Sequence, residues 1–165
     1  RRHLWRCHAH PERLTTGRCL LDEAVSAMPQ LYLSLGSNLG DRQHTLLQAL
    51  QLIDERVGSV YRVSSFIETE PWGFESDHPF LNAVCLVHTM MSPELCLEET
   101  QQIERELGRT AKSIDGHYHD RTIDIDLLMY DDLTIDTPDL QLPHPRMMER
   151  DFVLVPLREI GGTTS

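Results

Sequence analysis

Two aspartates, Asp124 and Asp126, stand two positions apart in an otherwise apolar run. If this run is a strand, both carboxylates lie on one face, and Ile123, Ile125 and Leu127 lie on the other. Neighbouring carboxylates repel each other on a sheet unless a cation neutralises them. Mg²⁺ takes oxygen ligands and is commonly held by one or two carboxylates together with substrate phosphates. The pair therefore predicts a Mg²⁺ site for phosphoryl chemistry; the alternative is a solvated acidic strand face.

Three basic side chains are placed where they could bind phosphate. Arg121 precedes the aspartates, and a guanidinium can grip phosphate oxygens through two hydrogen bonds. Arg109 begins the polar segment before them, and His144 stands between two prolines after them. The alternatives are a surface ion pair of little energetic value for Arg121, a solvated loop for Arg109, and a structural loop histidine for His144.

Other side chains could hold a flat heterocycle. Trp72 lies in a loop between two apolar runs, where it could stack on a ring or close the edge of the core. Phe80 and Asn82 begin the next predicted strand and share a face of it. An amide at that position could read a ring edge through its donor and acceptor groups; the alternative is a turn partner.

A segment with glycines and small polar residues, 35–41, follows the first predicted strand and opens a helix. Gly36 and its small neighbours allow a ligand to approach the backbone closely. The segment lacks the G-K-[ST] of a P-loop and the G-x-G-x-x-G of a dinucleotide site. By itself it predicts a turn with a helix cap.

The elements that must position these residues alternate in a simple order. Apolar and β-branched runs predict strands at 31–35, 60–67, 81–89 and 122–130, and helical spacing predicts helices after Asn38 and after Ser92. Residues 152–160 are apolar and compatible with either helix or extended chain. The order βαββαβ predicts an α+β, ferredoxin-like fold, with an antiparallel sheet and helices packed on one face.

Composition narrows the function classes. The chain has 165 residues and a net charge of -11, with a pI of ≈ 5.1. This predicts a single globular domain and weighs against nucleic-acid binding, because an acidic surface repels phosphate backbones. No apolar run is long enough for a membrane span. The four cysteines have no C-x-x-C spacing, which favours reduced thiols in a cytoplasmic protein.

Residues 1–28 differ in character from the rest of the chain. They hold five arginines against three carboxylates and show little periodicity. We expect them to form a poorly ordered or non-native extension, with Met28 as the natural start. Residues 29–165 are then the functional domain, and their abrupt end after an apolar run suggests a C-terminal truncation.

Six short motifs occur in one order: 35–41, 64–66, 68–73, 80–82, 121–126 and 142–144. Together they closely resemble the 6-hydroxymethyl-7,8-dihydropterin pyrophosphokinase family of folate biosynthesis, over about residues 31–160. The resemblance implies a ferredoxin-like enzyme, usually a monomer, that transfers diphosphate from ATP to the hydroxymethyl group of the pterin and releases AMP. The substrates are small molecules, with no nucleic-acid or membrane partner.

The resemblance also implies roles for particular residues. Asp124 and Asp126 match the acids that hold two Mg²⁺ ions, and Arg109 and Arg121 match catalytic arginines. The ATP-side positions are Gln101, Glu104, Arg121, His144 and Arg150. The pterin-side positions are Thr69, Trp72, Phe80, Asn82 and Phe152, with the two phenylalanines on the ring faces and Asn82 on a ring edge.

Three other functions compete with this one. An inactive member of the same fold would bind neither ATP nor Mg²⁺. An RNA-binding module would use the sheet of a ferredoxin-like fold, but the acidic charge and the absence of an RNP-type aromatic strand oppose it. A sugar-nucleotide transferase with a D-x-D motif would need a larger nucleotide-binding domain than this length provides.

Overall fold

The computed structural model describes residues 28–69, 79–108 and 123–161. Trp72, Arg109 and Arg121 lie outside these ranges, as do residues 1–27. Within them the chain forms, in order, β1 (Gln30–Ser37), α3 (Arg42–Arg56), β2 (Ser59–Val63), β3 (Ile67–Thr69), β4 (Phe80–His88), α4 (Pro93–Gly108), β5 (Asp124–Tyr130), β6 (Ile135–Asp136), β7 (Gln141–Leu142), a 3₁₀ turn η3 (Met147–Glu149) and α5 (Asp151–Glu159).

The main sheet has the strand order β2-β4-β1-β5, and β3 also pairs with β4. All of these pairings are antiparallel, which confirms the predicted βαββαβ arrangement. The strand expected over 60–67 is divided, because β2 and β3 are separated at Ser64. The Ser64 hydroxyl accepts a hydrogen bond from Val84 N at 2.9 Å, and Ser64 N donates to Val84 O at 2.9 Å. The chain therefore turns a corner at Ser64 while it remains attached to β4.

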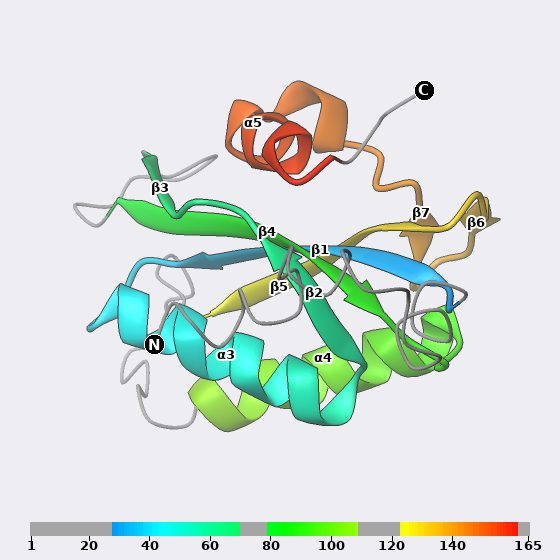
Figure 1. Cartoon of the computed structure of the whole chain (residues 1–165), viewed down its shortest axis with the longest axis horizontal. Coiled ribbons are helices and arrows are strands. Elements are labelled where there is room, and N and C mark those ends of the chain that lie inside the picture. The colour runs from blue at the N-terminus through cyan, green and yellow to red at the C-terminus, as the bar shows by residue number, and fades with distance from the viewer. Residues whose placement is uncertain (1–27, 70–78, 109–122, 162–165) are drawn as a thin grey trace, which may run out of the picture.

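Helices cover both faces of the sheet, which corrects the expectation of helices on one face. Figure 1 shows α3 and α4 together below the sheet and α5 above it. Val84, Leu86 and Leu128 form an apolar cluster on the upper face with Val153 and Leu157 of α5. Segment 152–160, which the sequence left open between helix and extended chain, is therefore helical, and its apolar residues pack on the apolar residues of this second face.

The larger core lies between the sheet and the helices α3 and α4. Leu31, Leu33 and Leu35 of β1 are fully buried there, packed with Leu50 of α3 and Ile103 of α4. This is the layer that fixes the strands, and hence the side chains on their opposite face.

Sequence signals located one helix start better than the other. Ser92 caps α4 by accepting a hydrogen bond from Leu95 N at 3.3 Å, as predicted. The cap of α3 is Asp41, which accepts from His44 N at 3.1 Å, rather than Asn38.

Of the expected thiols, Cys85 and Cys96 are free and buried, and burial raises the pKa of Cys96 to about 11. No helix among residues 28–69, 79–108 and 123–161 is long and apolar enough to cross a membrane.

Candidate active site

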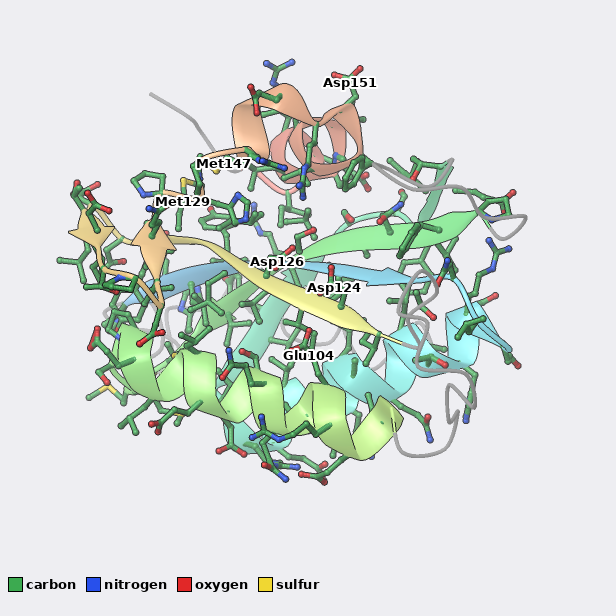
Figure 2. The ribbon with its side chains drawn as sticks, turned by 180° about the vertical axis from the view of Figure 1, so that it is seen from behind. Glu104, Asp124, Asp126, Met129, Met147 and Asp151 are labelled. Carbon is green, nitrogen blue, oxygen red and sulfur yellow. The ribbon has the colours of Figure 1, made fainter. Side chains whose placement is uncertain are left out.

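Asp124 and Asp126 lie on the face of β5 that carries α5, as the alternation predicted. Ile125 and Leu127 are 5% and 4% exposed in the core on the other face. Figure 2 shows both aspartates on β5, above Glu104 of α4. Because β5 is an edge strand of the main sheet, the two carboxylates lie at the edge of that face.

Glu104 of α4 reaches this edge from below the sheet. Its Oε2 accepts a hydrogen bond from Ile125 N at 2.8 Å, so the carboxylate lies level with the residue between the two aspartates. Burial raises the pKa of Glu104 to about 8, the hydrogen bond from Ile125 opposes this, and Asp124 and Asp126 raise it further. The concentration of acids at this edge favours the binding of a cation.

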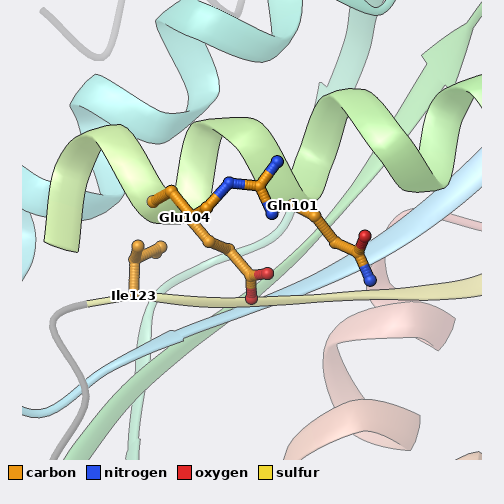
Figure 3. Close-up of a pocket in the computed structure, with 4 residues that line it drawn as sticks. Gln101, Glu104 and Ile123 are labelled. Atoms are coloured by element: carbon orange, nitrogen blue, oxygen red, sulfur yellow. The ribbon is translucent and has the colours of Figure 1, made fainter.

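Glu104 also lines an open pocket beside β5. The pocket has a volume of ≈ 420 Å³ and is lined by Gln101, Glu104, Arg105 and Ile123. Figure 3 shows Gln101 and Glu104 projecting from α4 toward β5. The two side chains predicted to lie on the ATP side are therefore brought together, next to the strand that carries the aspartates.

His144 lies on the other side of the aspartates. Its backbone N donates to Leu128 O at 2.8 Å, which ties the segment after β7 to β5. Its Nδ1 accepts from Arg146 N at 3.1 Å, so the ring proton is on Nε2. Burial lowers the pKa of His144, and Arg150 and Arg146 lower it further. A neutral histidine that can donate through Nε2–H is suited to hydrogen bonding with phosphate.

Arg150 presents an unsatisfied donor beneath α5. Its Nε is buried without a hydrogen-bond partner among the described residues. Its guanidinium carbon lies 5.7 Å from the ring centroid of Phe152. Buried polar groups are normally paired, so the Nε of Arg150 is a candidate donor to a ligand.

Thr69, Phe80 and Asn82 come together at the other end of the same face. Asn82 is 4% exposed, and its Nδ2 donates to Thr69 Oγ1 at 2.6 Å. A Cβ placed on Gly36 would lie 3.0 Å from Asn82 Oδ1 and 3.4 Å from Phe80. The absence of a side chain at Gly36 therefore keeps the amide oxygen and the aromatic ring accessible from the centre of the sheet.

Gly36 connects the two halves of the site. It pairs with Asn82 on β4 and with Asp124 on β5, so the three residues form one row across the sheet. With strands about 4.8 Å apart, the ends of the row are about 10 Å apart. The acidic pair and the ring-binding residues thus share one face, on either side of a glycine that leaves room between them.

Sequence reasoning missed Arg42, the first residue of α3. Its guanidinium donates to Pro79 O at 2.7 Å and to Glu68 Oε2 at 2.7 Å. Glu68 and Pro79 adjoin Thr69 and Phe80, so Arg42 holds both flanks of the ring-binding end. No local signal marks it, because its partners are 26 and 37 positions away.

The donor set fits Mg²⁺. Among residues 28–69, 79–108 and 123–161, no group of three or more His, Cys, Asp and Glu side chains is arranged to hold a metal ion, which a structural zinc site would require. Mg²⁺ needs only one or two carboxylates when phosphates and water complete its shell. Asp124 and Asp126 supply such a pair.

Comparisons with known proteins agree on one family. The family model for 7,8-dihydro-6-hydroxymethylpterin-pyrophosphokinase (HPPK) matches residues 32–162. A 2-amino-4-hydroxy-6-hydroxymethyldihydropteridine pyrophosphokinase of Porphyromonas gingivalis is 54% identical over 135 residues, or 81% of this chain and 92% of that protein. The enzyme of the same name from Bacillus subtilis is 46% identical over 130 residues, or 78% of this chain and 76% of that protein.

A solved structure supports the fold. The crystal structure of Plasmodium falciparum HPPK-DHPS superposes with a TM-score of 0.63 at 16% identity, and it covers 80% of this chain and 41% of that chain.

Proposed function

This chain belongs to the 7,8-dihydro-6-hydroxymethylpterin-pyrophosphokinase family, and we propose that the sheet face beneath α5 is where it transfers diphosphate from ATP to 6-hydroxymethyl-7,8-dihydropterin. The products are AMP and the pterin diphosphate, in the biosynthesis of folate. The observation that carries the location is the row Asp124–Gly36–Asn82. It sets a phosphate-binding end and a ring-binding end about two strand spacings apart.

The phosphate end handles charge. In this proposal Asp124 and Asp126 would hold two Mg²⁺ ions. When bound, these ions would neutralise the charge on the phosphates. His144 donates Nε2–H to a phosphate oxygen, and the guanidinium of Arg150 pairs with another. Gln101 and Glu104 line the side where the rest of the nucleotide lies. Arg109 and Arg121, outside the described residues, are assigned to the transferring phosphates from the sequence resemblance.

The ring end orients the acceptor. Asn82 binds an edge of the pterin through its amide, with Thr69 fixing the orientation of that amide by accepting from Nδ2. Phe80 and Phe152 cover the two ring faces, and Trp72, outside the described residues, is assigned to the same pocket from the sequence resemblance. Because diphosphate transfer needs positioning and charge stabilisation more than covalent chemistry, holding both substrates on one rigid sheet is the main contribution of the fold.

Two further parts of the proposal concern the state of the enzyme. We propose that it works in the cytoplasm, where the free thiols of Cys85 and Cys96 stay reduced. We also propose that it works as a monomer, because the row of residues that forms the site comes from one chain. Sedimentation at working concentration, with and without both substrates, tests the second part.

The test of the proposed function is a chromatographic assay for AMP. The chain is incubated with ATP, Mg²⁺ and 6-hydroxymethyl-7,8-dihydropterin. AMP should form only when the pterin is present. Asp126→Ala should reduce turnover by at least about 10³-fold, because loss of a metal ligand removes several kcal/mol of charge stabilisation.

Asp139→Ala is the matched control, because Asp139 is an exposed carboxylate outside the proposed site, and it should turn over normally. AMP that forms without pterin would contradict the acceptor. Near-normal turnover by Asp126→Ala would contradict the metal assignment.

A further inference from the structure

Helix α5 brings two proposed substrate-binding groups to the sheet at its N-terminal end. Arg150 precedes its first residue, and Phe152 lies in its first turn. This end has no side-chain cap, and its backbone hydrogen bonds, from Val153 N and Leu154 N to Arg150 O, are local. The placement of Arg150 and Phe152 depends on the contacts that hold the rest of the helix.

The C-terminal end of α5 is attached to the corner between β2 and β3. Glu159 Oε2 accepts from Ser65 N at 3.0 Å and from Ser65 Oγ at 2.8 Å. Arg62 of β2 donates to Ile160 O at 3.2 Å, which satisfies a carbonyl at the helix end. Gly161, with a φ of 86°, then ends the helix in the left-handed conformation. Figure 1 shows this helix lying over the face opposite α3 and α4.

The same corner is fixed to the strand that carries Asn82. Ser64 exchanges two hydrogen bonds of 2.9 Å with the backbone of Val84, two residues beyond Asn82. Ile67, two residues after Ser65, pairs with Asn82 itself. Asn82 on the sheet and Phe152 on the helix are therefore both positioned relative to residues 64–65.

The location of Glu159 argues for a role beyond helix stability. A carboxylate at a helix C-terminus is unfavourable, because the helix dipole places negative charge there. Its two hydrogen bonds to Ser65 are charge-assisted and therefore stronger than neutral ones. Together with the bond from Arg62 to Ile160 O and the apolar packing of Val153 and Leu157, these two bonds hold α5 against the sheet.

We propose that Ser65 and Glu159 are positioning residues for the diphosphate transfer: their contact fixes α5 over the sheet so that Phe152 and Arg150 meet the pterin and ATP. This inference rests on the proposed function. It also assigns a role to residues 64–66, a motif that the site itself does not use.

The test separates positioning from simple stability. Glu159→Ala should raise KM for both substrates about fivefold with a smaller change in kcat. Its melting temperature should fall only slightly, because removal of the unfavourable helix-end charge offsets part of the loss of two exposed hydrogen bonds. Glu159→Gln keeps an oxygen that accepts from Ser65 and should restore most of the affinity. Ser65→Ala keeps the backbone donor and should have an intermediate effect.

Two further variants act as controls. Combining Ser65→Ala with Glu159→Ala should add nothing to Glu159→Ala, because both remove one contact. Arg158→Ala changes the charge of the same helix turn at an exposed position and should leave both KM values unchanged. Unchanged KM values in Glu159→Ala, an equal rise in Arg158→Ala, or a rise that Glu159→Gln does not reverse would each overturn the proposal.

The outcome for the wild type separates the two proposals. A wild-type chain that forms no AMP contradicts the proposed function and, with it, the positioning role. A wild-type chain that turns over while Glu159→Ala matches it contradicts the positioning role alone.

Discussion

The two faces of the main sheet are built from the same strands but have different contents. Below the sheet, Leu31, Leu33 and Leu35 of β1 are fully buried under α3 and α4. Above it, the apolar cluster of Val84 and Leu128 with α5 is smaller. The remainder of that upper face carries Asp124 and Asp126 of β5, Gly36 of β1 and Asn82 of β4.

The difference follows from the pleat of the strands. Adjacent residues of a strand point to opposite faces, so a single strand such as β5 can supply core side chains below and carboxylates above. The lower face then stabilises the fold, and the upper face is free to hold charges that would be costly in a core. Because only part of the upper face is apolar and covered by α5, the rest can serve as a binding surface.

Leu33→Ala tests whether the lower face stabilises the fold, and we expect the largest effect from it. Leu33 is fully buried in the lower core, so its truncation should lower the free energy of unfolding by about 3 kcal/mol. Turnover of the folded fraction should be unchanged. Urea unfolding and a turnover assay on the same sample measure both. Met90→Ala, at a side chain that is 76% exposed, is the control and should change stability by less than about 0.5 kcal/mol.

Gly36→Val tests the upper face, where we expect a loss of turnover without a loss of fold. Valine favours a strand, but its side chain would occupy the space between Asn82 and Asp124, where a Cβ already lies 3.0 Å from Asn82 Oδ1. We expect turnover to fall at least about 100-fold while the circular dichroism spectrum stays the same. Gly108→Ala should remain active, because its added Cβ has no atom within 4 Å. An active Gly36→Val would show that the row is not the reaction surface.

The features of the two faces that depend on neighbouring residues in the chain could be predicted from the sequence. The alternation through Asp124, Ile125 and Asp126 predicted which side chains share a face, and Ser92 predicted where α4 begins. The strand order could not be deduced locally, so nothing in the sequence shows that Gly36 lies between Asp124 and Asn82. That arrangement depends on pairings between residues far apart in the chain.

Other features depended on tertiary contacts. Residues 152–160 include Pro156 inside the helix and have no cap, so local preference could not distinguish helix from strand. The helix is stabilised by packing on the apolar residues Val84 and Leu128 of the sheet. The hydrogen bond between Glu104 and Ile125 N could not be predicted locally, because the two residues are 21 positions apart. The motif resemblance supplied the site residues, and physical reasoning alone left alternatives for most of them.

Asn82→Ala tests which end of the upper face binds the pterin. It removes the amide that is proposed to bind the ring edge, so the affinity for the pterin should fall about tenfold, or 1.4 kcal/mol, while the affinity for ATP changes little. Isothermal titration with each ligand measures both. Thr69→Ser keeps the hydroxyl that accepts from Asn82 and should bind the pterin normally. A larger loss for ATP than for the pterin would show that the two ends of the site are assigned the wrong way round.

The smallest expected effect is a pH dependence of stability caused by Glu104. This residue of α4 reaches from below the sheet to the edge that carries the aspartates. Burial raises its pKa to about 8, with Asp124 and Asp126 adding to the shift. Between the ordinary value of 4.5 and about 8, the folded chain keeps a proton on Glu104 that the unfolded chain has released. The free energy of unfolding should therefore decrease as pH rises through this window. We expect a decrease of about 1 kcal/mol between roughly pH 6 and pH 8 without Mg²⁺, below the limit of about 1.4 kcal/mol per pH unit.

Glu104→Gln keeps an oxygen for Ile125 N and takes up no proton, so its stability should be nearly independent of pH in this window. Glu98→Gln, at an exposed position on the same helix, should keep the wild-type slope. Mg²⁺ bound at the aspartates would favour the ionised form of Glu104, so its addition should flatten the wild-type profile and leave that of Glu104→Gln unchanged. A slope that survives in Glu104→Gln would mean that α4 does not sense the charges on β5, and that the two faces are electrostatically independent.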